Sequence, residues 1–117
     1  KPDGSWGERH APHTTSYVES EDGQVVQTAW ALNALLLASE PDWDCLDRAA
    51  RFLARTQLGS GEWPRQEPHG VFFHTALLDY SLYKSYFPLV ALAAFEKRRA
   101  ERDQLIQEAK RATVAAE

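Results

Sequence analysis

One short sequence pattern occurs twice in this chain of 117 residues, and each copy ends in a tryptophan. The two tryptophans lie 57 positions apart. The residues that define the two copies are Gly4 and Trp6 in the first, and Leu53, Gln57, Gly61 and Trp63 in the second. A recurrence at this distance indicates a helical repeat, with a pair of helices in each interval. We expect the Gln57 side chain to bond backbone at a neighbouring helix terminus, and the Trp63 ring to pack on that terminus.

Apolar residues between the two tryptophans recur at helical spacing. They predict one helix over 24–38, ended by Pro41, and a second over about 44–57, stopped by the glycines after it. A third helical region is expected over about 75–99. Pro88 should kink or break it, because proline lacks a backbone N–H and clashes with the preceding turn.

The segments between and beyond these helices are expected to be irregular or solvated. Residues 1–22 and 58–74 are rich in Gly, Pro and polar side chains and are predicted to be loops. The charged residues 97–117 favour helix but carry few large apolar anchors, so a helical or disordered tail is expected. The predicted fold class is all-α, without a β-sheet in residues 1–95.

Composition excludes several functions. The net charge is −4 and no basic stripe is present, which argues against nucleic-acid binding. The single cysteine, Cys45, cannot form an internal disulfide, and no apolar run reaches the roughly 18–20 residues of a membrane span. With one thiol and no paired cysteines, the four histidines (His10, His13, His69 and His74) do not predict a metal site. Aspartates around Cys45 also argue against a nucleophilic thiol.

Aromatic residues are concentrated in 57–95, which holds eight of the thirteen in the chain. Tyr80 and Tyr83 lie three apart and so are expected to share one helix face, with Phe87 four residues further on. Such a cluster forms either an ordinary core or a wall that presents π-faces to positive charge. The residues alone favour the core interpretation.

The Gln57–Trp63 pattern resembles the QW motif of the squalene-hopene and oxidosqualene cyclases, the class II triterpene cyclases. The resemblance continues through GEWPRQEPHGVF, the tyrosine pair, the segment YFPLVAL and the upstream VVQTAWAL. It covers residues 1–96 and not the tail. The sequence Gly70-Val71-Phe72 is closer to the oxidosqualene branch than to the squalene-hopene branch.

The resemblance implies a fragment of a longer enzyme: the C-terminal helix-pair segment of an α/α (α6–α6) barrel that cyclises squalene or 2,3-oxidosqualene. In that family an aspartic acid starts a carbocation cascade, and no metal or other cofactor is needed. Phe72 matches a cavity phenylalanine, and Tyr80 and Tyr83 match paired cavity tyrosines. Peripheral membrane association of a cytoplasmic protein is also implied.

Some positions differ from the family. The acid motif, DxDD or DCTAE, is absent, and Asp42, Asp44 and Asp47 do not reproduce it, so the chain alone is expected to be inactive. Asp79 precedes Tyr80 where a small residue is usual. Phe73 and His74 replace residues that the oxidosqualene group often carries, and Ala49 replaces the glycine of the full QW motif.

Two other functions fit a helical repeat. A non-catalytic module would use exposed apolar faces to bind a partner helix or a second copy of itself, so a homo-oligomer is possible. A protein prenyltransferase β-subunit is also an α/α barrel, but its metal-ligand set is missing here.

Overall fold

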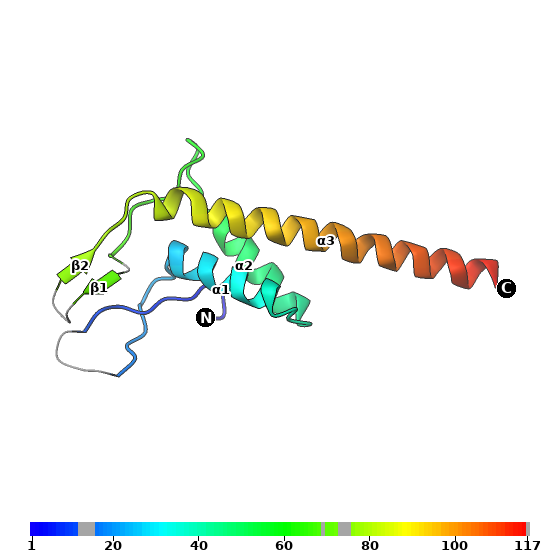
Figure 1. Cartoon of the computed structure of the whole chain (residues 1–117), viewed down its shortest axis with the longest axis horizontal. Helices are drawn as coiled ribbons and strands as arrows, with labels where there is room; N and C mark the ends of the chain where they lie inside the picture. The colour runs from blue at the N-terminus through cyan, green and yellow to red at the C-terminus, as the bar shows by residue number, and fades with distance from the viewer. Residues whose placement is uncertain (12–15, 69, 73–75, 117) are drawn as a thin grey trace.

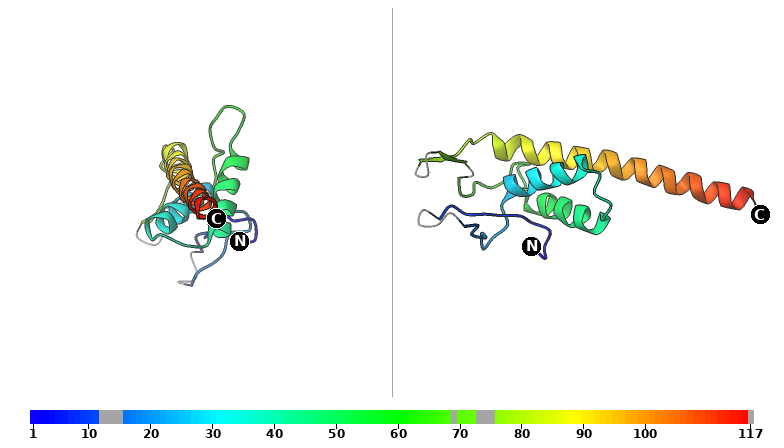
Figure 2. Two further views of the ribbon diagram at one scale, coloured as in Figure 1. Left: turned by 90° about the vertical axis from the view of Figure 1, so that its right-hand side faces the viewer. Right: turned by 60° about the horizontal axis from the view of Figure 1, so that its bottom comes forward.

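The computed structural model describes residues 1–11, 16–68, 70–72 and 76–116, with backbone only for 70–72. The described part contains three helices and two short strands: α1 (Val25–Leu37), α2 (Trp43–Thr56), β1 (Gly70–Phe72), β2 (Ala76–Leu78) and α3 (Tyr83–Ala115). α1 and α2 pack against the first half of α3, whose second half extends beyond them (Figure 1). The molecule is therefore elongated, with extents of 66 × 34 × 22 Å, and the right-hand view of Figure 2 shows its length.

Local chemistry explains the first two helices. The Asp42 carboxylate accepts a hydrogen bond from the backbone N–H of Cys45 (3.2 Å) and so caps α2. At the start of α1 the Gln66 side chain takes this role, because its Oε1 accepts from the N–H of Val25 (2.6 Å). The bounds of both helices agree with the predicted segments 24–38 and 44–57, and the all-α class is confirmed.

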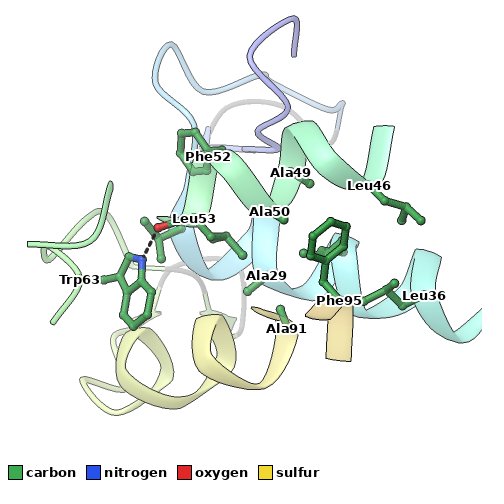
Figure 3. Packing of buried hydrophobic residues seen from close by; sticks show 12 residues of the cluster. Ala29, Leu36, Leu46, Ala49, Ala50, Phe52, Leu53, Trp63, Ala91 and Phe95 are labelled. Atoms are coloured by element: carbon green, nitrogen blue, oxygen red, sulfur yellow. Dashed lines mark hydrogen bonds between the residues drawn. The ribbon is translucent and has the colours of Figure 1, made fainter. Parts of the chain in front are cut away.

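The core lies where the three helices meet (Figure 3). α1 contributes a stripe at helical spacing, α2 contributes small and large apolar residues, and α3 contributes one alanine and one phenylalanine. The members of this core cluster are Val25, Ala29, Leu32 and Leu36 of α1, Leu46, Ala49, Ala50, Phe52 and Leu53 of α2, Trp63, and Ala91 and Phe95 of α3. Ala49 is fully buried, so a small side chain suits this position.

The expectation of no sheet was wrong. β1 and β2 form a two-stranded antiparallel sheet in which Phe72 faces Ala76 in the register. A further isolated bridge joins Glu8 and Glu19 in the N-terminal loop. The glycines and prolines of 58–74 obscured the short run of β-favouring residues at Gly70–Phe72, which is paired locally and needs no long alternating pattern.

Of the expected kink or break at Pro88, the structure shows no break, and the kink stays a prediction. α3 begins at Tyr83 rather than near residue 75, and it runs unbroken through Pro88 to Ala115. The proline therefore lies in the second turn, where it removes one intrahelical bond. Pro88, Ala91 and Phe95 are all buried, and this packing holds the helix together across the lost bond.

Residues 97–115 belong to α3, so this part of the tail is helical. Two of its arginines contact the other helices: Arg98 Nη1 donates to the carbonyl of Leu36 (2.8 Å), and the Arg102 guanidinium lies 4.0 Å from the ring centre of Trp43. From residue 103 to 116 every side chain is exposed. Whether 97–117 is a unit separate from 1–96 stays a prediction. None of the described helices is both long enough and apolar enough to cross a bilayer.

Candidate functional site

The two Gly-x-Trp turns have the same backbone geometry. Gly4 and Gly61 both have φ of +88°, a conformation that strongly favours glycine. The N–H of each glycine donates to the carbonyl three residues earlier, at 3.0 Å to Lys1 and 2.8 Å to Leu58. In each turn the backbone nitrogen of that earlier residue also donates to the carbonyl of the residue after the glycine. The two bonds run from Lys1 to Ser5 and from Leu58 to Glu62, both at 2.8 Å. The sequence recurrence thus corresponds to a structural one.

The second turn returns onto the helix from which it came. The Trp63 ring is 1% exposed and lies against the last turn of α2, where its indole N–H donates to the carbonyl of Leu53 (2.8 Å; Figure 3). The Gln57 side chain behaves differently from the expectation, since it donates to the carbonyl of Gly61 (2.7 Å) and not to a neighbouring helix terminus. Gln57 is the C-cap of α2, so this bond closes the turn locally.

The first turn docks on the side of α2. A Cβ atom at Gly4 would collide with the backbone of Arg48, so the two segments are in direct contact. Arg55 Nη2 contacts the Asp3 carboxylate at 3.1 Å. Burial of Asp3 acts to raise its pKa, but hydrogen bonds from Ser5 and the Arg55 charge outweigh it, and the net pKa is lowered. The backbone N–H of Trp6 then connects this turn to α1, because it donates to the Thr28 hydroxyl (2.9 Å).

Five aromatic side chains gather where α1 meets the start of α3, and we call them the aromatic cluster: Trp30, Tyr80, Tyr83, Tyr86 and Phe87. Tyr83 is central, with ring centres at 5.0 Å to Tyr80, 5.2 Å to Phe87, and 5.9 Å to both Trp30 and Tyr86. Most of these contacts are edge-to-face, the geometry in which ring quadrupoles attract.

The aromatic cluster is open on one side. Tyr80 is 54% exposed, and Trp30 and Tyr86 are also exposed. A ring in a core would be enclosed, whereas these rings present surface that a further molecule or protein segment can contact. In this chain Trp30, Tyr80 and Tyr86 therefore lie outside the buried core.

The structure brings the predicted tyrosines together but leaves the predicted phenylalanine undecided. Tyr80 and Tyr83 are in contact, with their ring planes at 32°. The expectation that they share one helix face was wrong, because α3 begins at Tyr83 and Tyr80 lies in the turn before it. For Phe72 only the backbone is described, paired with Ala76, and its side chain lies outside the described part. Phe73, His74, His13 and His69 also lie outside it.

Sequence reasoning placed Phe87 one turn after Tyr83 but missed Trp30 as a member of the cluster. Trp30 is displaced from the core stripe of α1 formed by Val25, Ala29 and Leu32, so its position predicts an outward ring. Its partners on α3, however, depend on tertiary packing. Within the described residues, no three His, Cys, Asp or Glu side chains are arranged to hold a metal ion.

Comparison with known proteins decides the family. The profile of the squalene-hopene cyclase C-terminal domain matches residues 1–97. The chain belongs to this cyclase family. The lanosterol synthase of Saccharomyces cerevisiae is 43% identical over 96 residues, and that of Candida albicans 38% over 102 residues. The lanosterol synthase of Homo sapiens is 34% identical over 101 residues.

The cyclase match covers most of this chain but little of its relatives. The alignment with the Saccharomyces cerevisiae protein covers 81% of this chain and 13% of that protein. Each of the other two alignments covers 86% of this chain and 14% of the relative. The matched region contains both Gly-x-Trp turns and the aromatic cluster. Family membership favours the cyclase interpretation over the interaction module and the prenyltransferase, and it confirms the resemblance inferred from the motifs.

Proposed function

We propose that this chain is the C-terminal segment of an oxidosqualene cyclase, in which the aromatic cluster forms part of the cavity wall. The observation that carries the proposal is the contact between the exposed Tyr80 and Tyr83 at the centre of the cluster, inside the region matched by the family profile. The relatives named above are lanosterol synthases, which supports 2,3-oxidosqualene rather than squalene as the substrate.

The role of these rings follows from electrostatics. Ring closure of a polyene generates carbocations, which neither accept nor donate conventional hydrogen bonds. An aromatic face attracts a cation, by roughly 2 kcal/mol or more when water is excluded. A wall of rings therefore stabilises cationic intermediates without offering them a nucleophile or a strong base.

Phe72 provides the sharpest test, because the sequence places it with the tyrosines and the structure leaves its ring undescribed. In the full-length polypeptide that contains this chain, Phe72→Leu keeps similar bulk and removes the π-face. Losing about 1–2 kcal/mol at one cation changes the ratio of further cyclisation to early proton loss by roughly 5- to 30-fold. Incubation with 2,3-oxidosqualene and gas chromatography should therefore reveal incompletely cyclised products at a nearly unchanged thermal midpoint.

Tyr80→Ala should have a weaker effect of the same kind, complicated by the cavity that it leaves. Leu105→Ala serves as the control, because its side chain is exposed on the far half of α3. A normal product with a lowered midpoint for Phe72→Leu would instead assign that ring to the core.

We also propose peripheral membrane association of the whole cytoplasmic protein, through segments other than the described helices. The apolar substrate, which partitions into lipid, supports this. Flotation of the full-length polypeptide with phosphatidylcholine vesicles tests it, and release by mild detergent but not by high salt is expected.

A further inference from the structure

We propose that residues 63–65 act as a brace that fixes the tyrosine-bearing turn 79–84, with Arg65 and Asp79 as positioning residues for Tyr80 and Tyr83. The inference rests on the proposed function, since it assigns to the turn the role of holding cavity rings. It adds two charged residues and a defined mechanical connection to the rings already described.

The brace is itself anchored on both sides. Trp63 is buried and bonds the carbonyl of Leu53 in α2 at 2.8 Å. Gln66, just after the brace, accepts from the N–H of Val25 at 2.6 Å and donates to the carbonyl of Gly23 at 2.9 Å. Residues 63–65 are thus tied to the end of α2 on one side and to the start of α1 on the other.

The brace contacts the turn at both ends of the turn. Arg65 directs Nε and Nη2 to the same Asp79 carboxylate oxygen, at 2.9 and 2.8 Å. The Lys84 ammonium group donates to the carbonyl of Trp63 at 3.0 Å. Asp79 immediately precedes Tyr80, and Lys84 immediately follows Tyr83. The two tyrosines therefore lie between two fixed points.

The turn needs such fixing because regular structure gives it little. The turn comprises the four residues between β2 and α3 and the first two residues of α3, and its Tyr80 is more than half exposed. Its backbone is bonded locally, where the N–H of Tyr83 donates to the carbonyl of Tyr80 (2.9 Å). A ring that stabilises a cation must be held close to one position, because the attraction falls steeply as the ring moves away.

The exposure of the Arg65–Asp79 pair allows its effect on ring position to be distinguished from an effect on folding. The Arg65 side chain is 78% exposed and that of Asp79 21%, and ion pairs at this level of exposure contribute little to global stability. Breaking the pair should therefore free the turn while the three-helix core stays intact.

The experiment uses the full-length polypeptide with Arg65→Gln, Asp79→Asn and the charge-swapped double variant Arg65→Asp with Asp79→Arg. Arg51→Gln is the matched control, since it breaks the exposed Arg51–Asp47 pair on α2. Products from 2,3-oxidosqualene, KM, kcat and thermal midpoints are measured. We expect the fraction of incompletely cyclised product to rise about three- to tenfold in both single variants, in line with a partial loss of cation stabilisation. The thermal midpoint should match the control, and the double variant should recover part of the normal product.

A second readout does not depend on turnover. Fluorotyrosine at position 80 gives a fluorine NMR line that should sharpen in both single variants, as the ring gains mobility, and stay unchanged in the control. The brace is overturned if Tyr80→Ala alters the products while the Arg65 and Asp79 variants alter neither products nor line width. It is equally overturned if those variants lower the midpoint and leave the products normal. If Tyr80→Ala and Phe72→Leu leave the products normal, the proposed function itself fails.

Discussion

Gly4 and Gly61 share one backbone conformation and differ in what surrounds them. Both have φ of +88°, but a Cβ at Gly61 would meet nothing within 4 Å, while at Gly4 it would collide with the backbone of Arg48. Substitution of each glycine therefore measures two effects separately: backbone strain alone at Gly61, and strain together with a steric clash at Gly4.

For Gly61→Ala we expect a loss of about 1–2 kcal/mol in the free energy of unfolding, the cost of a left-handed conformation for an L-residue. For Gly4→Ala we expect a larger loss, of roughly 3 kcal/mol or more, because backbone must also shift. Urea unfolding followed by circular dichroism measures both. Equal losses would show that the first turn can move away from α2.

At the level of single residues, local chemistry was predictable and tertiary partners were not. The Gly-x-Trp pattern predicted a tryptophan packed on a helix end, as Trp63 is. It did not predict that Gln57 bonds the turn itself, because one amide can satisfy several nearby carbonyls and the sequence does not rank them. Likewise the spacing paired Tyr80 with Tyr83, while the contacts of Tyr83 with Trp30 required the packing of α1 on α3.

At the level of elements, predictability followed the length and strength of each pattern. α1 and α2 have sustained apolar periodicity and clear terminators, and their bounds were predicted to within one or two residues. β1 and β2 have three residues each, too few for an alternating pattern. The predicted start of α3 near residue 75 was wrong for the same reason, because β2 and the turn after it occupy residues that were predicted to be helical.

The far half of α3 gives an element-scale prediction. Arg98→Ala and Arg102→Ala should each cost roughly 0.5–1 kcal/mol, since they remove a bond to the end of α1 and a cation–π contact with Trp43. Deleting residues 104–117 should change the free energy of unfolding by less than about 0.5 kcal/mol, because every described side chain there is exposed. Thermal unfolding of these variants beside Arg111→Ala, an exposed control, makes the comparison. A large loss on deletion would mean that the far half contacts the core.

At the level of the whole molecule, the cavity wall that we propose is open to water in this chain. Exposed rings lie at one end, and a pocket of about 760 Å³ between α1 and α3 is lined partly by Leu37, Val90 and Ala94. The family, the helical class and the tyrosine pair could be predicted from the motifs. How the rings face the substrate could not, because that depends on segments of the relatives which the match does not cover.

The isolated chain of 117 residues should therefore convert neither squalene nor 2,3-oxidosqualene. Two physical reasons lead to this expectation. The sequence lacks the family's DxDD or DCTAE acid motif, so no aspartic acid is placed to start the cascade. The exposed rings are also in water, where a carbocation would be captured by solvent before a wall of π-faces could guide it, and where each cation–π contact is weakened. Gas chromatography of extracts after incubation with each substrate makes the measurement, with the full-length polypeptide as the positive control. Any polycyclic product from the isolated chain would show that it carries its own acid and its own closed cavity, and would require a different assignment of the catalytic residues.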